Sequence, residues 1–285
     1  MCPACAHNSS RSTAVPFRQG LRGEKVLRQC RQCQSFFDPD NYDEQKEVQH
    51  TLRMPWGDTH SGKDLNKFKM KMYHSVLTLL SQYCPPPATL LDAGCAYGGF
   101  LDEASKQGYK VCGYDILPEA VDYVRTLDLP AERAFSIGAV KSVQDGTLDV
   151  LTCLDCNCYW QNQPSELRCA FAKLRPGGYL VMRVVDKSWL FSLGLRIHQF
   201  APVIGKQILT RAINDHRFSM PVQSLLKVIR RCGFEVIVVS PYRAIHSTHT
   251  RWLVKLSFAL GTLLWATTGI FMAPGAVILT RKPDI

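Results

Sequence analysis

The 285-residue chain has no internal repeat and no low-complexity tract, which excludes repeat architectures and long disordered segments. Its first eight residues lack the basic and apolar regions of a signal peptide, so we expect a cytoplasmic protein. In that reducing compartment, its twelve cysteines are not expected to form a disulfide scaffold. Hydrophobic residues make up 46% of the chain and charged residues 20%, which indicates a globular protein with room for one large α/β domain and a small module.

The sequence also lacks any run of lysines with interleaved aromatic residues, so no segment indicates a nucleic-acid groove. Acidic residues are few: 24 Asp and Glu stand against 34 Lys and Arg, and the formal net charge is +10. This excess is compatible with RNA, an anionic membrane surface or a phosphorylated substrate. Charge alone therefore leaves three classes of partner open.

A glycine loop stands between two apolar runs that each end in an aspartate. The first run ends in Asp92 and opens into a loop that contains Gly94 and Gly98, and the second, which begins at Lys110, ends in Asp115. A strand, a glycine loop, a helix and a second strand with a terminal carboxylate form the first half of a nucleotide-binding βαβ unit.

The carboxylate before the loop helps to decide which nucleotide is bound. Gly94-x-Ala96-x-x-Gly99 fits a lenient dinucleotide fingerprint, and Asp115 follows at the distance expected for a ribose contact. Asp92, however, would face the pyrophosphate of NAD, and two like charges in a partly dry site repel each other. S-adenosylmethionine carries an ammonium and a sulfonium instead of phosphate, so Asp92 favours this cofactor.

Three segments resemble the class I S-adenosylmethionine-dependent methyltransferases. LLDAGCAYGGFLDEASKQGYKVCGYDI resembles their motifs I and II, residues 174–182 their helix–turn–strand with LKPGG, and residues 233–239 their sixth strand. The resemblance covers roughly residues 86–285 and implies an α/β fold, with a Rossmann-like, mostly parallel seven-stranded sheet and helices on both faces. It also implies S-adenosylmethionine as the cofactor, bound by Asp92, Gly94, Ala96, Gly98, Asp115, Ile116 and Asp155.

Strand and helix patterns alternate along this domain, which favours a mostly parallel sheet covered on both faces. Ligands in such sheets lie beyond the carboxyl ends of the strands, where Asp92, Asp115 and Asp155 are expected. The segments expected as strands are 131–135, 148–154, 179–185 and 276–282, and those expected as helices are 118–126, 164–174 and 222–232.

Two cysteine pairs indicate a metal site near the N-terminus. Cys2-x-x-Cys5 and Cys30-x-x-Cys33 have the spacing that brings four thiolates to one tetrahedral zinc ion. Such a site has no open position, so we expect structural zinc. Four free surface cysteines are an alternative, and a redox pair would need a thioredoxin-like βαβ pattern, which is not seen. Many bacterial methyltransferases of the class named above begin with such a zinc ribbon, which we assign to residues 1–45.

A helical connector is expected over residues 46–85, before a methyltransferase domain over residues 86–285. Apolar side chains recur in the connector at helical spacing, and three prolines after Cys84 mark its end. The apolar positions are Leu65, Phe68, Met72, Val76, Leu79, Leu80 and Tyr83.

Catalytic candidates follow the fourth and fifth strands. Related enzymes often carry a Glu-His pair after the fourth strand, where this chain has Cys158 and Tyr159. Residues 214–219 resemble the family's substrate-side loop, and His216 is our candidate general base, because the unperturbed pKa of histidine is near neutrality. Asp186, directly after the fifth strand, is the second candidate. A solvated histidine before a helix cap is the alternative for His216.

Two apolar inserts, near residues 189–213 and 251–273, are expected to lie over the site. The second includes 18 uncharged residues, 256–273, which is the lower limit for a membrane span. A substrate lid, a membrane-surface helix and a span are all compatible with this pattern. The inserts favour a lipophilic or lipid-linked acceptor, and they are compatible with peripheral binding at the inner face of the membrane.

The sequence therefore predicts methyl transfer from S-adenosylmethionine to a small-molecule, sugar or lipid-linked acceptor, with no nucleic-acid partner. A zinc-ribbon RNA methyltransferase and a non-catalytic protein that binds the cofactor or a partner are the alternatives. The sequence predicts neither the acceptor atom nor the oligomeric state.

Overall fold

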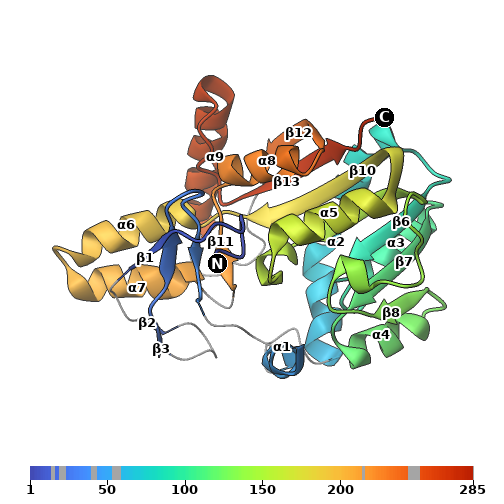
Figure 1. Cartoon of the computed structure of the whole chain (residues 1–285), viewed down its shortest axis with the longest axis horizontal. Helices are drawn as coiled ribbons and strands as arrows, with labels where there is room; N and C mark the ends of the chain where they lie inside the picture. The colour runs from blue at the N-terminus through green and yellow to red at the C-terminus, as the bar shows by residue number, and fades with distance from the viewer. Residues whose placement is uncertain are drawn as a thin grey trace.

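The computed structural model describes residues 1–13, 17–18, 24–39, 44–52, 59–213, 216–242 and 251–284. Seven strands form its main sheet in the order β12-β13-β10-β9-β6-β7-β8 (Figure 1). Their bounds are Thr89–Ala93 (β6), Lys110–Asp115 (β7), Ala131–Arg133 (β8), Leu148–Leu154 (β9), Leu174–Val185 (β10), Glu235–Pro241 (β12) and Gly275–Arg281 (β13). Most strand ends lie within one or two residues of the predicted ones.

Neighbouring strands of this sheet pair in parallel except at β13, which is antiparallel to both β10 and β12. The predicted seven-stranded, mostly parallel sheet is thus confirmed, as a mixed sheet with one antiparallel strand. Because β6, β7, β9 and β10 run in one direction, their carboxyl ends lie on one edge of the sheet. Val185, near that edge, pairs with Gly275, so β13 begins where β10 ends.

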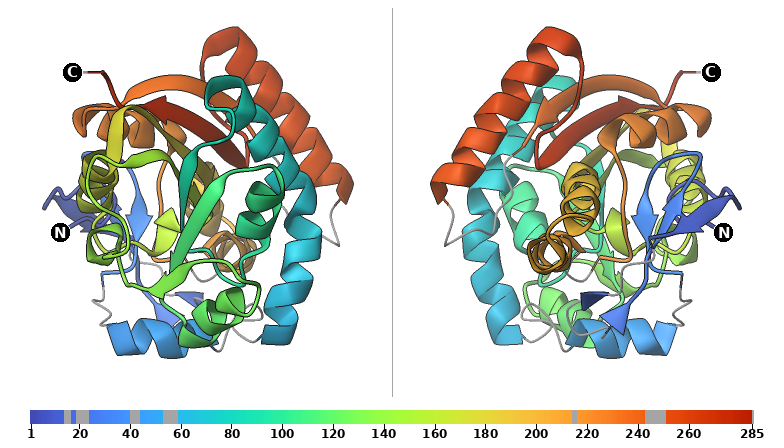
Figure 2. Two further views of the ribbon diagram at one scale, coloured as in Figure 1. Left: turned by 90° about the vertical axis from the view of Figure 1, so that its right-hand side faces the viewer. Right: turned by 90° about the vertical axis from the view of Figure 1, so that its left-hand side faces the viewer.

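Helices cover both faces of the sheet, as predicted (Figure 2). One face carries α5 and α8, and the other carries α2, α3 and α4. In α8, Leu225, Leu226 and Ile229 recur at helical spacing and are buried against the sheet. The bounds are Thr59–Tyr83 (α2), Gly99–Lys106 (α3), Pro118–Arg125 (α4), Gln163–Lys173 (α5) and Val222–Arg231 (α8).

The predicted connector contains two helices, α1 (Glu44–Leu52) and α2. Met72 and Val76 of α2 are buried in the same apolar cluster as Leu90 of β6 and Leu101 of α3. The second helix therefore shares the core of the sheet. Two of the predicted apolar positions have side chains outside the described residues: Leu65 and Phe68.

The N-terminal module forms a four-stranded antiparallel sheet in the order β1-β4-β5-β11. The fourth strand, β11 (Phe218–Ser219), comes from the C-terminal half of the chain, and its Phe218 pairs with Phe37. This pairing joins the module to the larger domain through backbone hydrogen bonds. The module's own strands are β1 (Ser10–Ser12), β2 (Phe17–Arg18), β3 (Glu24–Lys25), β4 (Arg28–Cys30) and β5 (Phe36–Phe37).

Both apolar inserts are helical. The first forms a hairpin of α6 (Ser188–His198) and α7 (Pro202–Ile213), and the second forms α9 (Arg251–Thr268). A Cβ on Gly205 would lie 2.4 Å from the Cα of His198, so only glycine permits this close crossing of α6 and α7. Among the described residues, no helix is both long and apolar enough to cross a membrane.

Candidate functional site

The loop after β6 has a backbone that requires glycine at its first position. Gly94 has φ +69°, and a Cβ there would lie 2.8 Å from the Cβ of Cys156 in the loop after β9. Ala96 (φ 45°) and Gly98 (φ 73°) also lie in the left-handed region, and Gly98 precedes the first residue of α3. The two loops at the carboxyl edge therefore touch, and this contact depends on the absence of a side chain.

Asp115, at the end of β7, holds the glycine loop in place. Its carboxylate accepts hydrogen bonds from the backbone N–H of Ala96 at 2.8 Å and of Leu117 at 3.0 Å. Burial raises the pKa of this carboxyl, although the backbone N–H groups of Leu117, Ala96 and Ile116 act against the shift. A carboxylate has about four lone-pair positions, so two hydrogen bonds leave capacity for a ligand.

Asp92 is buried at the end of β6, beneath the same loop. Thr152 of β9 donates a hydrogen bond to it at 2.6 Å. Burial raises the pKa of Asp92 to about 7, although the hydrogen bond from Thr152 and the charge of Lys69 lower it. Burial destabilises the ionised form of Asp92, so a positively charged group beside it would be stabilising.

Two polar residues of α2 approach these acids, and sequence analysis missed both. The positive charge of Lys69 acts on Asp92 and Asp115. Tyr73, one helical turn later, is buried with its ring edge-on to Phe100 at 5.6 Å. Burial, and then the charges of Asp92 and Asp155, raise the pKa of the Tyr73 hydroxyl. The i, i+4 spacing of the pair was visible, but only the fold shows that this face of the helix turns toward the site.

Asp155 follows β9 directly, with φ +67°. Its backbone N–H donates to the carbonyl of Arg183 at 2.9 Å, and its Oδ2 forms an ion pair with the Arg183 guanidinium. Arg183 is buried and stacks under the ring of Tyr242 at 5.1 Å. The second oxygen of Asp155, Oδ1, is buried and has no hydrogen-bond partner in the described part of the chain. Ile116, the remaining predicted cofactor residue, is half-buried and packs against the apolar cluster of Tyr97, Leu117 and Ala120.

His216 contacts the loop after β9. Its ring meets that of Tyr159 edge-on, with centroids 5.7 Å apart and planes at 83°. The next residue, Arg217, donates its N–H to the carbonyl of Cys158 at 3.1 Å and accepts a bond from the N–H of Asp38 at 2.8 Å. The N-terminal module therefore holds the His216 segment against the loop that carries Asp155. The neighbouring Asn214 and Asp215 lie outside the described residues.

Asp186, the second catalytic candidate, is buried and accepts three hydrogen bonds from the protein. Its Oδ1 accepts from the N–H of Ser188 at 3.0 Å and from the Ser188 hydroxyl at 2.5 Å, and its Oδ2 accepts from the N–H of Val222 at 2.9 Å. Burial raises the pKa of Asp186. This geometry favours a structural role, the joining of the first turns of α6 and α8, and the catalytic assignment stays a prediction.

Cys2, Cys5, Cys30 and Cys33 converge on one point, with ligand atoms within 4.8 Å of one another. The sulfur atoms of Cys2 and Cys33 are 3.8 Å apart, and those of Cys5 and Cys30 are 3.6 Å apart. A tetrahedral ion with zinc–sulfur bonds of about 2.3 Å separates its ligands by about 3.8 Å, so the four thiols fit zinc.

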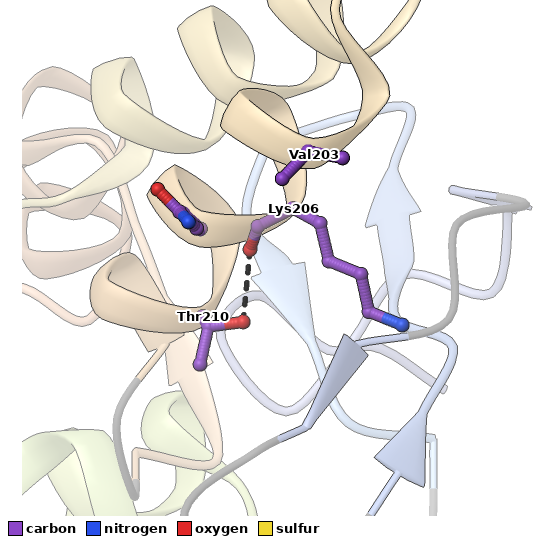
Figure 3. Close-up of a pocket in the computed structure, with 4 residues that line it drawn as sticks. Val203, Lys206 and Thr210 are labelled. Carbon is purple, nitrogen blue, oxygen red and sulfur yellow. Dashed lines mark hydrogen bonds between the residues drawn. The ribbon is translucent and has the colours of Figure 1, made fainter.

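A hollow of about 350 Å³ lies along one face of α7 (Figure 3). Val203, Lys206, Gln207 and Thr210 line it, and the Thr210 hydroxyl donates to the carbonyl of Lys206 at 2.8 Å. It contains none of the predicted cofactor, catalytic or metal residues. We therefore place the candidate site at the carboxyl edge of the sheet, where the acids and the glycine loop meet.

Comparison with known proteins points to one family. A family model described as a methyltransferase domain matches residues 66–239. Nodulation protein S from Rhizobium tropici is 30% identical over 123 residues, which cover 41% of this chain and 51% of that protein. A ubiquinone biosynthesis O-methyltransferase from Albidiferax ferrireducens is 25% identical over 39% of this chain and 47% of its own length. The chain thus spans about half the length of the curated relatives it matches.

A solved structure supports the fold over a longer stretch. An S-adenosylmethionine-dependent methyltransferase from Thermotoga maritima superposes with a TM-score of 0.52 and 15% identity, covering 82% of this chain and 99% of that one. At this identity the match shows the fold alone.

Proposed function

The chain belongs to the methyltransferase-domain family, and from that premise we propose that it transfers a methyl group from S-adenosylmethionine to a small-molecule, sugar or lipid-linked acceptor. The observation that carries the proposal is the glycine loop between two buried aspartates. Asp92 lies beneath the loop and Asp115 accepts a hydrogen bond from its Ala96 N–H at 2.8 Å. Buried carboxylates favour a cationic ligand and oppose the phosphates of a dinucleotide.

Each predicted cofactor residue has a role in this proposal. The free lone pairs of Asp115 accept from the ribose hydroxyls, and half-buried Ile116 contacts the adenine ring. Asp92 and the unpartnered Oδ1 of Asp155 attract the positively charged end of the cofactor. Gly94, Ala96 and Gly98 keep the backbone close to the ligand, since no side chain projects from the two glycines.

The chemistry requires alignment and, for a hydroxyl or amine acceptor, removal of a proton. S-adenosylmethionine supplies an electrophilic methyl group on a sulfonium, with a neutral thioether as leaving group. His216 accepts the proton from the acceptor atom, and Tyr159 orients the imidazole through the edge-on contact at 5.7 Å. The O-methyltransferase named among the relatives supports an oxygen on a lipophilic molecule as the first acceptor class to test.

We also propose that one structural zinc ion is bound by Cys2, Cys5, Cys30 and Cys33. The sulfur separations of 3.6 and 3.8 Å support it. Zinc supplies a tetrahedral cross-link between the two knuckles and stabilises the module from which β4 and β5 extend.

Calorimetry tests the cofactor assignment. S-adenosylhomocysteine should bind, NAD should not, and Asp115→Ala should weaken binding by about 1–3 kcal/mol through a lost charged hydrogen bond. Asp122→Ala, an exposed aspartate on α4 with a 74% exposed side chain, is the matched control and should bind like the wild type. Binding of NAD without S-adenosylhomocysteine would overturn the proposal.

The acceptor is found by incubating cell extracts with the protein and methyl-labelled cofactor, followed by mass spectrometry. Label in the lipid or small-molecule fraction supports the proposal. Label in RNA would support the zinc-ribbon RNA methyltransferase instead, and binding without any transfer would support a non-catalytic role.

A further inference from the structure

The helical inserts expose most of the large apolar side chains on the described surface. Of fifteen exposed large hydrophobic residues, nine lie in residues 187–213 and 251–273. Phe200, at the turn between α6 and α7, is 88% exposed. The others are Leu193, Val203, Ile204, Leu256, Leu260, Leu263, Ile270 and Met272. This concentration exceeds the scattered apolar exposure of an ordinary soluble surface.

Each insert has a covered side and an uncovered side. Phe191 of α6 stacks on Phe36 of the N-terminal module at 5.0 Å, whereas Phe200 at the hairpin turn is exposed. In α9, Trp265 packs on Phe271 at 5.6 Å, whereas Leu256, Leu260 and Leu263, spaced by four and three residues, share one exposed helix face. Each insert is therefore packed on one side, and its apolar residues are exposed on the other.

Both inserts leave the same edge of the sheet. α6 begins after Val185 of β10, and that residue pairs with Gly275, where the chain returns from α9. In Figure 1 the α6–α7 hairpin and α9 both project beyond the body of the molecule. This is the edge that carries Asp92, Asp115 and Asp155, so both inserts start from the side of the sheet that holds the candidate site.

The charge of the inserts has one sign. Residues 189–213 contain Arg196, Lys206 and Arg211, residues 251–273 contain Arg251 and Lys255, and neither segment contains an acid. These five basic residues give the two inserts a formal charge of +5. Apolar helical segments whose only charged residues are basic are complementary to an anionic lipid surface.

We propose that the α6–α7 turn and the exposed face of α9 together dock on an anionic lipid bilayer, without crossing it. The apolar side chains enter the boundary between headgroups and acyl chains, and the basic residues contact the lipid phosphates. A second copy of this chain is a poorer occupant, since a symmetric contact would bring cation against cation. Docking turns the carboxyl edge toward the membrane, from which a lipophilic acceptor enters. The proposed docking surface does not include the cofactor loop, so the docking proposal does not depend on the class of the acceptor.

Vesicle flotation of the full chain tests this proposal. The wild type should float with vesicles of phosphatidylcholine and phosphatidylglycerol, and less with phosphatidylcholine alone. Phe200→Asp and Leu260→Asp should each lower the bound fraction, and Arg196→Glu should weaken binding by about fivefold or more, because each basic residue near the surface contributes about that factor. Rising salt should release the protein.

The control variant is Leu127→Asp, which places a charge at a 39% exposed leucine outside the inserts and should leave flotation unchanged. Binding of S-adenosylhomocysteine, measured on every variant, shows that the fold is intact and separates failure of docking from failure of the proposed function. A wild type that stays unbound with anionic vesicles overturns the proposal. So does a dimer in light scattering that Phe200→Asp converts to a monomer, because the surface would then bind a second copy.

Discussion

On the cofactor side of the candidate site, Asp92, the glycine loop and Asp115 come from residues 89–117, and Asp115 accepts hydrogen bonds from the Ala96 and Leu117 N–H groups within that segment. Around His216 the construction differs. Tyr159, which contacts His216, comes from the loop after β9. The strand β11, which follows His216, pairs with β5 of the N-terminal module. The hydrogen bond between Asp115 and the glycine loop lies within thirty residues, and the same half also meets Thr152 and Cys156 near the end of β9. The His216 half is held by contacts across the whole chain.

The difference predicts that the two halves fail separately. Loss of the N-terminal module removes the strand that pairs with β11 but touches none of the hydrogen bonds of Asp115. A change in the glycine loop should leave the module and its pairing with Phe218 intact. Sites without shared partners act independently. Here the loop after β9 touches both halves, through Cys156 and Tyr159, so coupling between the halves would pass through this loop.

The largest effect is expected from Cys30→Ser. Structural zinc in small modules contributes about 10–16 kcal/mol of binding free energy, which is also folding free energy, so loss of one ligand should unfold the module. Zinc measured by elemental analysis should fall from about one ion per chain to none. Methyl transfer should be lost, while calorimetric binding of S-adenosylhomocysteine remains. Cys169→Ser, outside the cysteine cluster, is the control. If cofactor binding disappears as well, the two halves are not independent.

Replacement of His216 by alanine should come next. Removal of a general base costs about 10²-fold or more in kcat, and the effect should be confined to turnover of the acceptor. His74→Ala, which removes an exposed histidine paired with Glu103, should leave turnover unchanged. Full activity of the His216 variant would contradict its assignment as the general base.

A smaller effect, confined to the cofactor side, is expected from Gly94→Ala. Gly94 and Gly146 have similar φ values of +69° and +73°, but a Cβ on Gly146 has nothing within 4 Å whereas one on Gly94 meets Cys156 at 2.8 Å. Both variants should lose about 1–2 kcal/mol of stability to the left-handed backbone. Only Gly94→Ala should weaken binding of S-adenosylhomocysteine, by about tenfold or more, because its loop must move. Equal affinities for the two variants would contradict the contact.

The smallest effect is a pH dependence at Asp92. Burial raises its pKa to about 7, so the carboxyl is neutral below that pH and charged above it. Affinity for the cationic cofactor should therefore rise between about pH 6 and pH 8, by up to about tenfold per pH unit on the acid side. In the ligand-free protein, the folded state holds a proton that the unfolded state releases, so this group adds stability as the pH falls from about 7 toward 4. Asp92→Asn should remove both trends, in calorimetry and in thermal unfolding.

Much of the sheet was predictable because its strands are continuous apolar runs. β9 spans Leu148–Leu154, as predicted, and α8 ends one residue before the predicted end. β11 was missed because a two-residue strand has no periodicity to detect, and its pairing partner lies about 180 residues earlier in the chain. The helices of the α6–α7 insert were not predicted, although the segment itself was recognised as apolar.

The sequence was sufficient for the cofactor loop, because its glycines, its two acids and their spacing are requirements that one short segment meets alone. The convergence of the four cysteines was predictable for the same reason, since the two-residue spacing within each pair allows both thiolates to bind one metal ion. Tertiary structure alone decided what Asp186 does, because its hydrogen bond to Val222 joins residues 36 positions apart. It also decided that Lys69 and Tyr73 face the acids, and that the N-terminal module supports His216. Those contacts depend on which surfaces of the chain pack against each other, and a local sequence pattern does not predict that packing.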